Sequence, residues 1–136
     1  LTYAESMVCA FKDPKYTSEE FDNKSAEWAL NEVRVNAGMP PVNISDPNEF
    51  LRALQNEWRV EFAFEDHRFW DVRRWKIGYD TQRLLYGVRI VNESGNLRFY
   101  RNLYENRMWK ECMNLYPIPQ NELFKNPNLN PQNPEW

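Results

Sequence analysis

The chain has 136 residues, of which 42% are hydrophobic and 15% aromatic, and its formal net charge is −3. This many large apolar side chains can bury a core and exclude an intrinsically disordered chain. The mild negative charge does not suit a protein that binds nucleic acid by neutralising phosphates, and no apolar run approaches the roughly 20 residues of a membrane-spanning helix. The single histidine and the two cysteines, Cys9 and Cys112, form no metal-binding pattern. We expect two buried thiols, and a disulfide between them is the alternative.

The first forty residues predict two helices. Residues 1–11 form the first, and the second begins at Thr17 or Ser18 and ends before Gly38, which we expect at the left-handed position after the helix. Two antiparallel helices joined by a short turn are typical of one tetratricopeptide-like helical pair, which we place at residues 1–38. Such pairs need neighbours to bury their faces, and the chain starts with leucine. We therefore expect a processed chain or a fragment of a larger protein.

A third helix has a strong start signal in SDPNE. Asp46 is the expected N-cap, Pro47 suits the first helical position, and Glu49 completes a capping box. The apolar spacing predicts that this helix runs to about Asp66. A further helical segment is expected over residues 69–75.

The character of the sequence then changes. The runs 87–91 and 97–101 alternate with period two around a turn-forming NESGN segment, which predicts a β-hairpin. Prolines are frequent in residues 114–136, where we expect an extended strap. Leu129 and Trp136 are expected to dock on the core, and a free tail is the alternative.

The densest stretch is EFAFEDHRFWDVRRW, residues 61–75. His67 lies four residues before Asp71, a spacing that brings a histidine and a carboxylate to one helix face and suits a general base. Nucleophilic catalysis would also need a serine or cysteine and an oxyanion hole, and no sequence feature supplies them. Three carboxylates spaced by four predict a solvated stripe or salt-bridge partners for residues such as Arg68: Glu57, Glu61 and Glu65.

A structural interpretation of this stretch is stronger. Asp71 and Glu65 are matched acceptors for the forked guanidinium groups of Arg68, Arg73 and Arg74. Trp70 and Trp75 offer faces on which arginines stack. These residues, among them Arg68, Trp70, Asp71, Arg74 and Trp75, therefore predict a self-locking junction between helices, with no catalytic residue and no enzyme activity.

Three motifs follow one another in the chain: ALNEVRVNAGMPPV (29–42), EWRVEFAFEDHRFWDVRRW (57–75) and LYPIPQNELFKNPNLNPQNPEW (115–136). Together they closely resemble the C-terminal region of the SusD/RagB family. The resemblance implies a mainly α fold. A tetratricopeptide-like helical hairpin would occupy residues 1–38. Residues 39–136 would form the SusD-type C-terminal region, with its helices, one β-hairpin as a variable insert and an extended Pro/Asn-rich tail.

The resemblance also implies a function. Family members are surface lipoproteins of the Bacteroidetes outer membrane that bind glycans, or in some cases peptides, without chemistry. They act as a lid on a SusC-like TonB-dependent transporter, as part of polysaccharide utilization. The expectation is thus a non-catalytic glycan-binding component of nutrient uptake, anchored by an N-terminal lipid that this chain lacks, with no cofactor, metal or nucleic acid. Alternatives are a region that contacts the transporter without a ligand site, a peptide-binding RagB-like member and, from the carboxylates, a glycoside hydrolase.

Sugar-binding proteins place aromatic rings against pyranose faces and surround them with polar groups. The segment RFYRNLYENRMWK, residues 98–110, mixes such residues. We take Tyr100, Tyr104, Trp109 and Arg107 as candidate ligand-binding residues. The alternative is that these aromatics pack the hairpin onto the helices.

Overall fold

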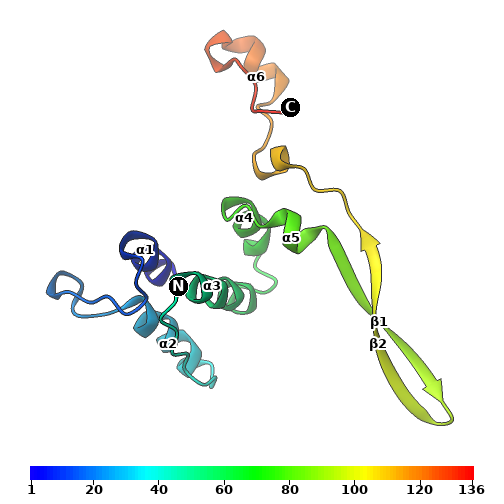
Figure 1. Ribbon diagram of the computed structural model, residues 1–136. Helices are drawn as coiled ribbons and strands as arrows, with labels where there is room; N and C mark the ends of the chain where they lie inside the picture. Colours follow the sequence, from blue (N-terminus) through cyan, green and yellow to red (C-terminus); the bar gives the residue numbers. More distant parts are fainter. The chain divides into compact units, whose positions relative to one another are not determined.

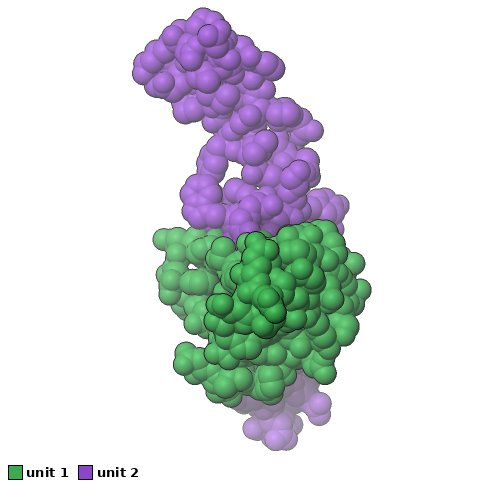
Figure 2. All heavy atoms as spheres, turned by 90° about the vertical axis from the view of Figure 1, so that its left-hand side faces the viewer, with its two compact units in different colours: residues 1–68 green, residues 69–136 purple.

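The computed structural model describes residues 1–136. The chain divides into two compact units, residues 1–68 and 69–136, coloured separately in Figure 2. It contains six α-helices, three short 3-10 helices and one two-stranded antiparallel sheet, so the predicted mainly α fold is confirmed. No helix combines the length and the apolar character needed to cross a membrane.

The first unit is built from α1 (Thr2–Phe11), the 3-10 helix η1 (Glu19–Phe21), α2 (Ala26–Asn36) and α3 (Pro47–Glu61). Figure 1 shows α1, α2 and α3 gathered together. Their facing apolar side chains form a small core: Ala4, Met7, Val8, Ala26, Leu30, Phe50, Leu54 and Trp58. At period 3.6 these positions fall on one stripe of each helix, which is why each helix buries one face.

The predicted start of the second helix is wrong. After η1 the chain turns through Asp22 and Asn23, whose φ angles of 53° and 56° lie in the left-handed region. The helix α2 then begins with Ser25 as N-cap, whose hydroxyl accepts a hydrogen bond from the Trp28 N–H at 3.0 Å. Asp and Asn tolerate the left-handed conformation better than other residues with a side chain, so the break falls where they are adjacent.

The predicted end of α2 and the predicted start of α3 are confirmed. Gly38 has a φ of 73° and follows α2, and the Met39 N–H donates to the Arg34 carbonyl at 2.8 Å, which completes a Schellman end. Asp46 caps α3 by accepting from the Glu49 N–H at 2.7 Å. The helix α3 ends five residues earlier than predicted, at Glu61, and a turn with two left-handed residues leads into α4 (His67–Arg74).

A buried ion pair joins α2 to α3. The Arg34 Nη1 lies 2.6 Å from the Glu57 Oε2, and both side chains are largely buried. The Arg34 Nε also donates to the Pro40 carbonyl at 3.0 Å. Asn31 and the backbone of Val42 exchange two hydrogen bonds of 2.8 and 2.9 Å, which hold the connecting loop. Glu57 is therefore not part of a solvated stripe but a salt-bridge partner, which was the alternative expected for these carboxylates, and its partner is Arg34.

The second unit contains most of α4, α5 (Gly78–Gln82) and a hairpin of β1 (Leu84–Glu93) and β2 (Asn96–Asn106). The predicted hairpin is confirmed and is longer than its alternating runs. A bulge interrupts the register between Leu85 and Tyr86. At the turn, Ser94 and Gly95 both have positive φ angles, and the Gly95 N–H donates to the Asn92 side chain at 2.9 Å.

The C-terminal part carries η2 (Glu111–Asn114), α6 (Gln120–Lys125) and η3 (Pro127–Leu129) between its prolines. The tail is thus not extended throughout. The Gln132 side chain exchanges two 2.8 Å hydrogen bonds with the backbone of Ile118. The Trp136 indole N–H lies 3.1 Å from the carbonyl oxygens of Cys112 and Leu115, so the end of the chain folds back within this unit.

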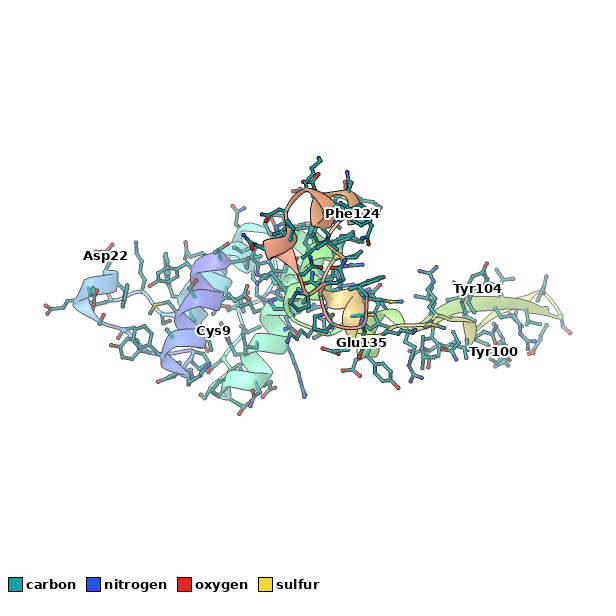
Figure 3. All side chains as sticks on the ribbon, turned by 90° about the horizontal axis from the view of Figure 1, so that it is seen from above. Cys9, Asp22, Tyr100, Tyr104, Phe124 and Glu135 are labelled. Atoms are coloured by element: carbon teal, nitrogen blue, oxygen red, sulfur yellow. The ribbon has the colours of Figure 1, made fainter.

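Both cysteines are free. Cys112 is buried, as expected, but the expectation is wrong for Cys9, which is exposed on α1 and labelled in Figure 3. It falls outside the buried stripe formed by Ala4, Met7 and Val8.

Candidate functional site

The residues predicted to form a structural lock lie on and around α4. Asp71 is buried and accepts a hydrogen bond from the Arg74 Nε at 2.8 Å. The Arg74 guanidinium in turn lies 4.3 Å from the centre of the Trp75 ring. Arg68 is half-buried at the end of the first unit, whereas Trp70 is 57% exposed. The set therefore divides between an inner and an outer face of α4, and its locking role stays a prediction.

The only histidine, His67, packs against two aromatic rings. His67 lies 4.7 Å from the Trp58 ring centre and 4.9 Å from that of Phe62, nearly parallel to the latter. Glu61 and Glu65, the neighbouring carboxylates of the predicted stripe, are exposed. The ring contacts of His67 give this side chain a packing role within the first unit.

The outer face of α4 presents aromatic rings. We define the aromatic cluster as Phe69, Trp70 and Tyr116. Phe69 meets Trp70 edge-on with ring centres 5.1 Å apart, and Tyr116 lies 6.0 to 6.2 Å from both rings. The three side chains are 43%, 57% and 55% exposed. Half-exposed rings held by one another form a rigid apolar platform.

An arginine lies on this platform. The Arg73 guanidinium is 3.6 Å from the Phe69 ring centre, and its Nη1 donates to the Phe69 carbonyl at 2.8 Å. It also lies 5.3 Å from the Trp109 ring and 5.9 Å from the Tyr116 ring. Three aromatic neighbours fix its orientation and remove part of its water shell.

Two adjoining hollows meet at this arginine, and we call them together the Arg73 cleft. The larger has a volume of about 530 Å³ and is lined by Trp70, Arg73, Arg74, Lys76, Asn114, Leu115 and Tyr116. The smaller has a volume of about 320 Å³ and is lined by Arg73, Met113, Leu115, Tyr116, Pro117 and Trp136. Both volumes fall within the range of small-molecule sites, and the mixture of rings with a few hydrogen-bonding groups suits a sugar.

The four predicted ligand-binding residues are not gathered in one place. Tyr100 and Tyr104 project from β2, as Figure 3 shows, and Tyr104 is 79% exposed. Arg107 pairs with Glu105 at 2.8 Å beyond the end of the strand. No ring contact joins Trp109 to either tyrosine.

Trp109 belongs instead to the surroundings of Arg73. Its indole packs directly on Gly78, where an added Cβ would overlap the ring. Of the four candidates, only Trp109 therefore approaches the Arg73 cleft, and ligand binding by any of them stays a prediction.

The sequence reasoning missed Phe69, Arg73 and Tyr116 as surface residues. One signal was present: Phe69 and Arg73 are four residues apart and so share a helix face. Tyr116 comes from a segment more than forty residues later, and its approach to α4 has no local signal.

Three comparisons with known proteins show the family to which the chain belongs. The sequence model of the SusD family matches residues 1–136. A SusD-like protein P2 from Formosa agariphila is 32% identical over 108 residues, which is 76% of this chain and 18% of that protein. A crystal structure of a SusD-like protein from Bacteroides fragilis matches with a TM-score of 0.69 and 39% identity, covering 87% of this chain and 22% of that one. The chain thus spans about a fifth of the length of these relatives, and the resemblance seen in its three motifs is confirmed.

Proposed function

Because the chain belongs to the SusD family, we propose that it contributes to a non-catalytic glycan-binding protein of the bacterial outer-membrane surface. This protein is anchored as a lipoprotein. It captures oligosaccharide and passes it to a SusC-like TonB-dependent transporter.

The Arg73 cleft is the observation that supports a ligand site within these residues. Trp70 and Tyr116 offer ring faces to the C–H groups of a pyranose. Arg73, Lys76 and Asn114 surround them with donors for hydroxyl oxygens. Because each such hydrogen bond replaces one with water, the affinity is expected to be modest.

Calorimetric titration against a panel of oligosaccharides tests this proposal. We expect Trp70→Ala and Tyr116→Ala each to weaken the binding of a hit about three- to tenfold, the loss of one ring contact. Phe124→Ala is the matched control, since Phe124 is 77% exposed on α6 and lines none of the hollows. Equal losses in all three variants would exclude the cleft, and Tyr104→Ala and Trp109→Ala would then test the residues of the 98–110 segment. Binding of peptides alone would favour the RagB-like alternative.

A second candidate, a region that contacts the transporter without its own ligand site, is favoured by the hairpin. Its register places two polar residues, Asn92 and Arg101, and six apolar side chains on one face: Tyr86, Val88, Ile90, Leu97, Phe99 and Leu103. All six apolar side chains are between 49% and 66% exposed. The other face carries polar residues such as Asn102 and the Glu93–Arg98 ion pair. A mostly apolar strand face with this exposure is typical of an interaction surface.

Co-purification of the transporter tests this candidate. A double variant, Ile90→Asp with Phe99→Asp, should lose the transporter while glycan titration is unchanged. Asn102→Asp, on the polar face, is the control and should retain it. Retention by the double variant would contradict a role of the hairpin in transporter contact.

A further inference from the structure

The charges of the side chains that line the larger hollow of the Arg73 cleft are unbalanced. Its larger hollow is lined by three cationic side chains, Arg73, Arg74 and Lys76, and by no carboxylate. Buried Asp71 offsets one of them, because it pairs with Arg74. Two positive charges therefore remain at the cleft of a chain whose net charge is −3.

These two cations have no acidic partner. Arg73 donates to a backbone carbonyl and stacks on a ring, and neither contact neutralises its charge. Lys76 is exposed and forms no ion pair. A guanidinium flanked by aromatic rings is partly desolvated, which strengthens its attraction for an anion, and its fork suits a carboxylate or a sulfate.

Nearby carboxylates define where an anion fits. Glu111 and Glu135 line a neighbouring hollow that shares Lys76, Asn114 and Leu115 with the cleft. An anionic group is repelled from that side and attracted towards Arg73, next to the rings of Trp70 and Tyr116. The positive charge and the sugar-stacking platform therefore coincide.

We propose that the Arg73 cleft selects an anionic saccharide, one whose sugars carry carboxylate or sulfate groups. This rests on the proposed glycan-binding function and adds the chemical class of the ligand. The pyranose ring lies on Trp70 or Tyr116, and its acidic group is bound by Arg73, with Lys76 adding long-range attraction.

Titration with three matched probes tests the proposal: an oligogalacturonate, a sulfated galactose oligomer and a neutral galactose oligomer of equal length. We expect at least one anionic probe to bind about tenfold more tightly than the neutral one, the value of one charge-assisted hydrogen bond, and to weaken as salt is raised. The two anionic probes distinguish carboxylate from sulfate. Equal affinity for all three probes would overturn the proposal while the glycan-binding function stands. Binding of no probe and of no sugar in the wider panel would instead reject the function, and the proposal with it.

Single-residue variants test which cations of the cleft attract the anionic probe. Lys76→Gln should weaken the anionic probe about threefold more than the neutral probe and reduce the salt dependence of anionic binding. Lys12→Gln, an equal charge change at an exposed lysine of the first unit that lines none of the hollows, should do neither. Arg73→Lys keeps the charge but loses the fork, and we expect a larger loss than for Lys76→Gln. Identical effects of the Lys76 and Lys12 variants would show a general charge effect and overturn the proposal.

Discussion

Replacing Glu57 with alanine tests the buried ion pair that joins α2 to α3. The change leaves the Arg34 guanidinium without a counterion in a place where its side chain is only 16% exposed. Removing one partner of a buried pair costs about 3–5 kcal/mol in the free energy of unfolding. Arg34 keeps its hydrogen bond to the Pro40 carbonyl and some access to water. We therefore expect the lower end of that range, about 3 kcal/mol.

The double variant Arg34→Met with Glu57→Leu tests whether the loss of stability comes from the unpaired buried charge. It removes both buried charges and keeps side chains of similar volume, so it is expected within about 1 kcal/mol of the wild type, because apolar replacements of buried pairs are often neutral. Arg34→Met alone, which buries an unpaired carboxylate, should cost about as much as Glu57→Ala. If Glu57→Leu alone costs as much as Glu57→Ala, the two single losses of about 3 kcal/mol and a double-variant loss of at most about 1 kcal/mol give a coupling of about 5–6 kcal/mol.

Urea unfolding followed by tryptophan fluorescence measures these changes. At a slope of about 1–3 kcal/mol per molar, a loss of 3 kcal/mol lowers the midpoint by roughly 1–3 M. Glu93→Ala is the matched control, because Glu93 and Arg98 are 2.7 Å apart but both well exposed. We expect it to cost less than about 1 kcal/mol. A Glu57→Ala variant as mild as this control, or additive single variants, would refute the reasoning.

Three further predictions concern single residues. Ser25→Ala should lower the free energy of unfolding by about 1 kcal/mol in thermal unfolding, because it removes the N-cap of α2. Ser18→Ala should cost almost nothing, since the buried Ser18 hydroxyl has no hydrogen-bond partner. Equal losses in the two variants would contradict this assignment of the cap. Gly78→Ala should destabilise the second unit by about 1–3 kcal/mol, because the new methyl group overlaps an indole, and a neutral result would contradict that packing. A thiol reagent should modify Cys9 rapidly in the native protein and Cys112 only on unfolding, so two equally fast thiols would contradict the assigned burial.

Local chemistry allowed several features to be predicted from the sequence. The Asp46 cap and the Gly38 end depend on hydrogen bonds within one or two turns of chain, which the residue types alone determine. The hairpin turn at Ser94 and Gly95 is local in the same way. Such signals are visible without any tertiary contact.

The start of α2 could not be predicted in this way. Several residues before it are good caps, and tertiary contacts decide between them. The Glu27 N–H in the first turn of α2 donates to the Pro14 carbonyl at 2.9 Å, and the Glu27 carboxylate accepts from the Ile44 N–H at 2.8 Å. These bonds anchor α2 one turn after η1, between segments that are distant in the sequence.

The candidate site was missed for a related reason. The high density of aromatic and polar residues in segment 98–110 led to the prediction that this segment binds the ligand. Most of that segment lies on a hairpin whose rings make few contacts outside it. The Arg73 cleft instead combines one face of α4 with residues around Tyr116, and only folding brings these two segments together.

The two faces of α4 explain how one short motif can serve both the fold and a ligand. Asp71 and Val72 are buried, while Phe69 and Trp70 are exposed to about one half, and Arg73 lies over the aromatic cluster. The inner residues need a fixed partner, because a buried charge without one is costly. The outer rings and guanidinium need rigid support if they are to bind without a further loss of side-chain entropy. The Asp71–Arg74 pair lies beside the platform, and Trp70 and Arg74 belong both to the predicted lock and to the lining of the Arg73 cleft. The same residues of α4 could therefore hold the helix in place and support the proposed binding surface.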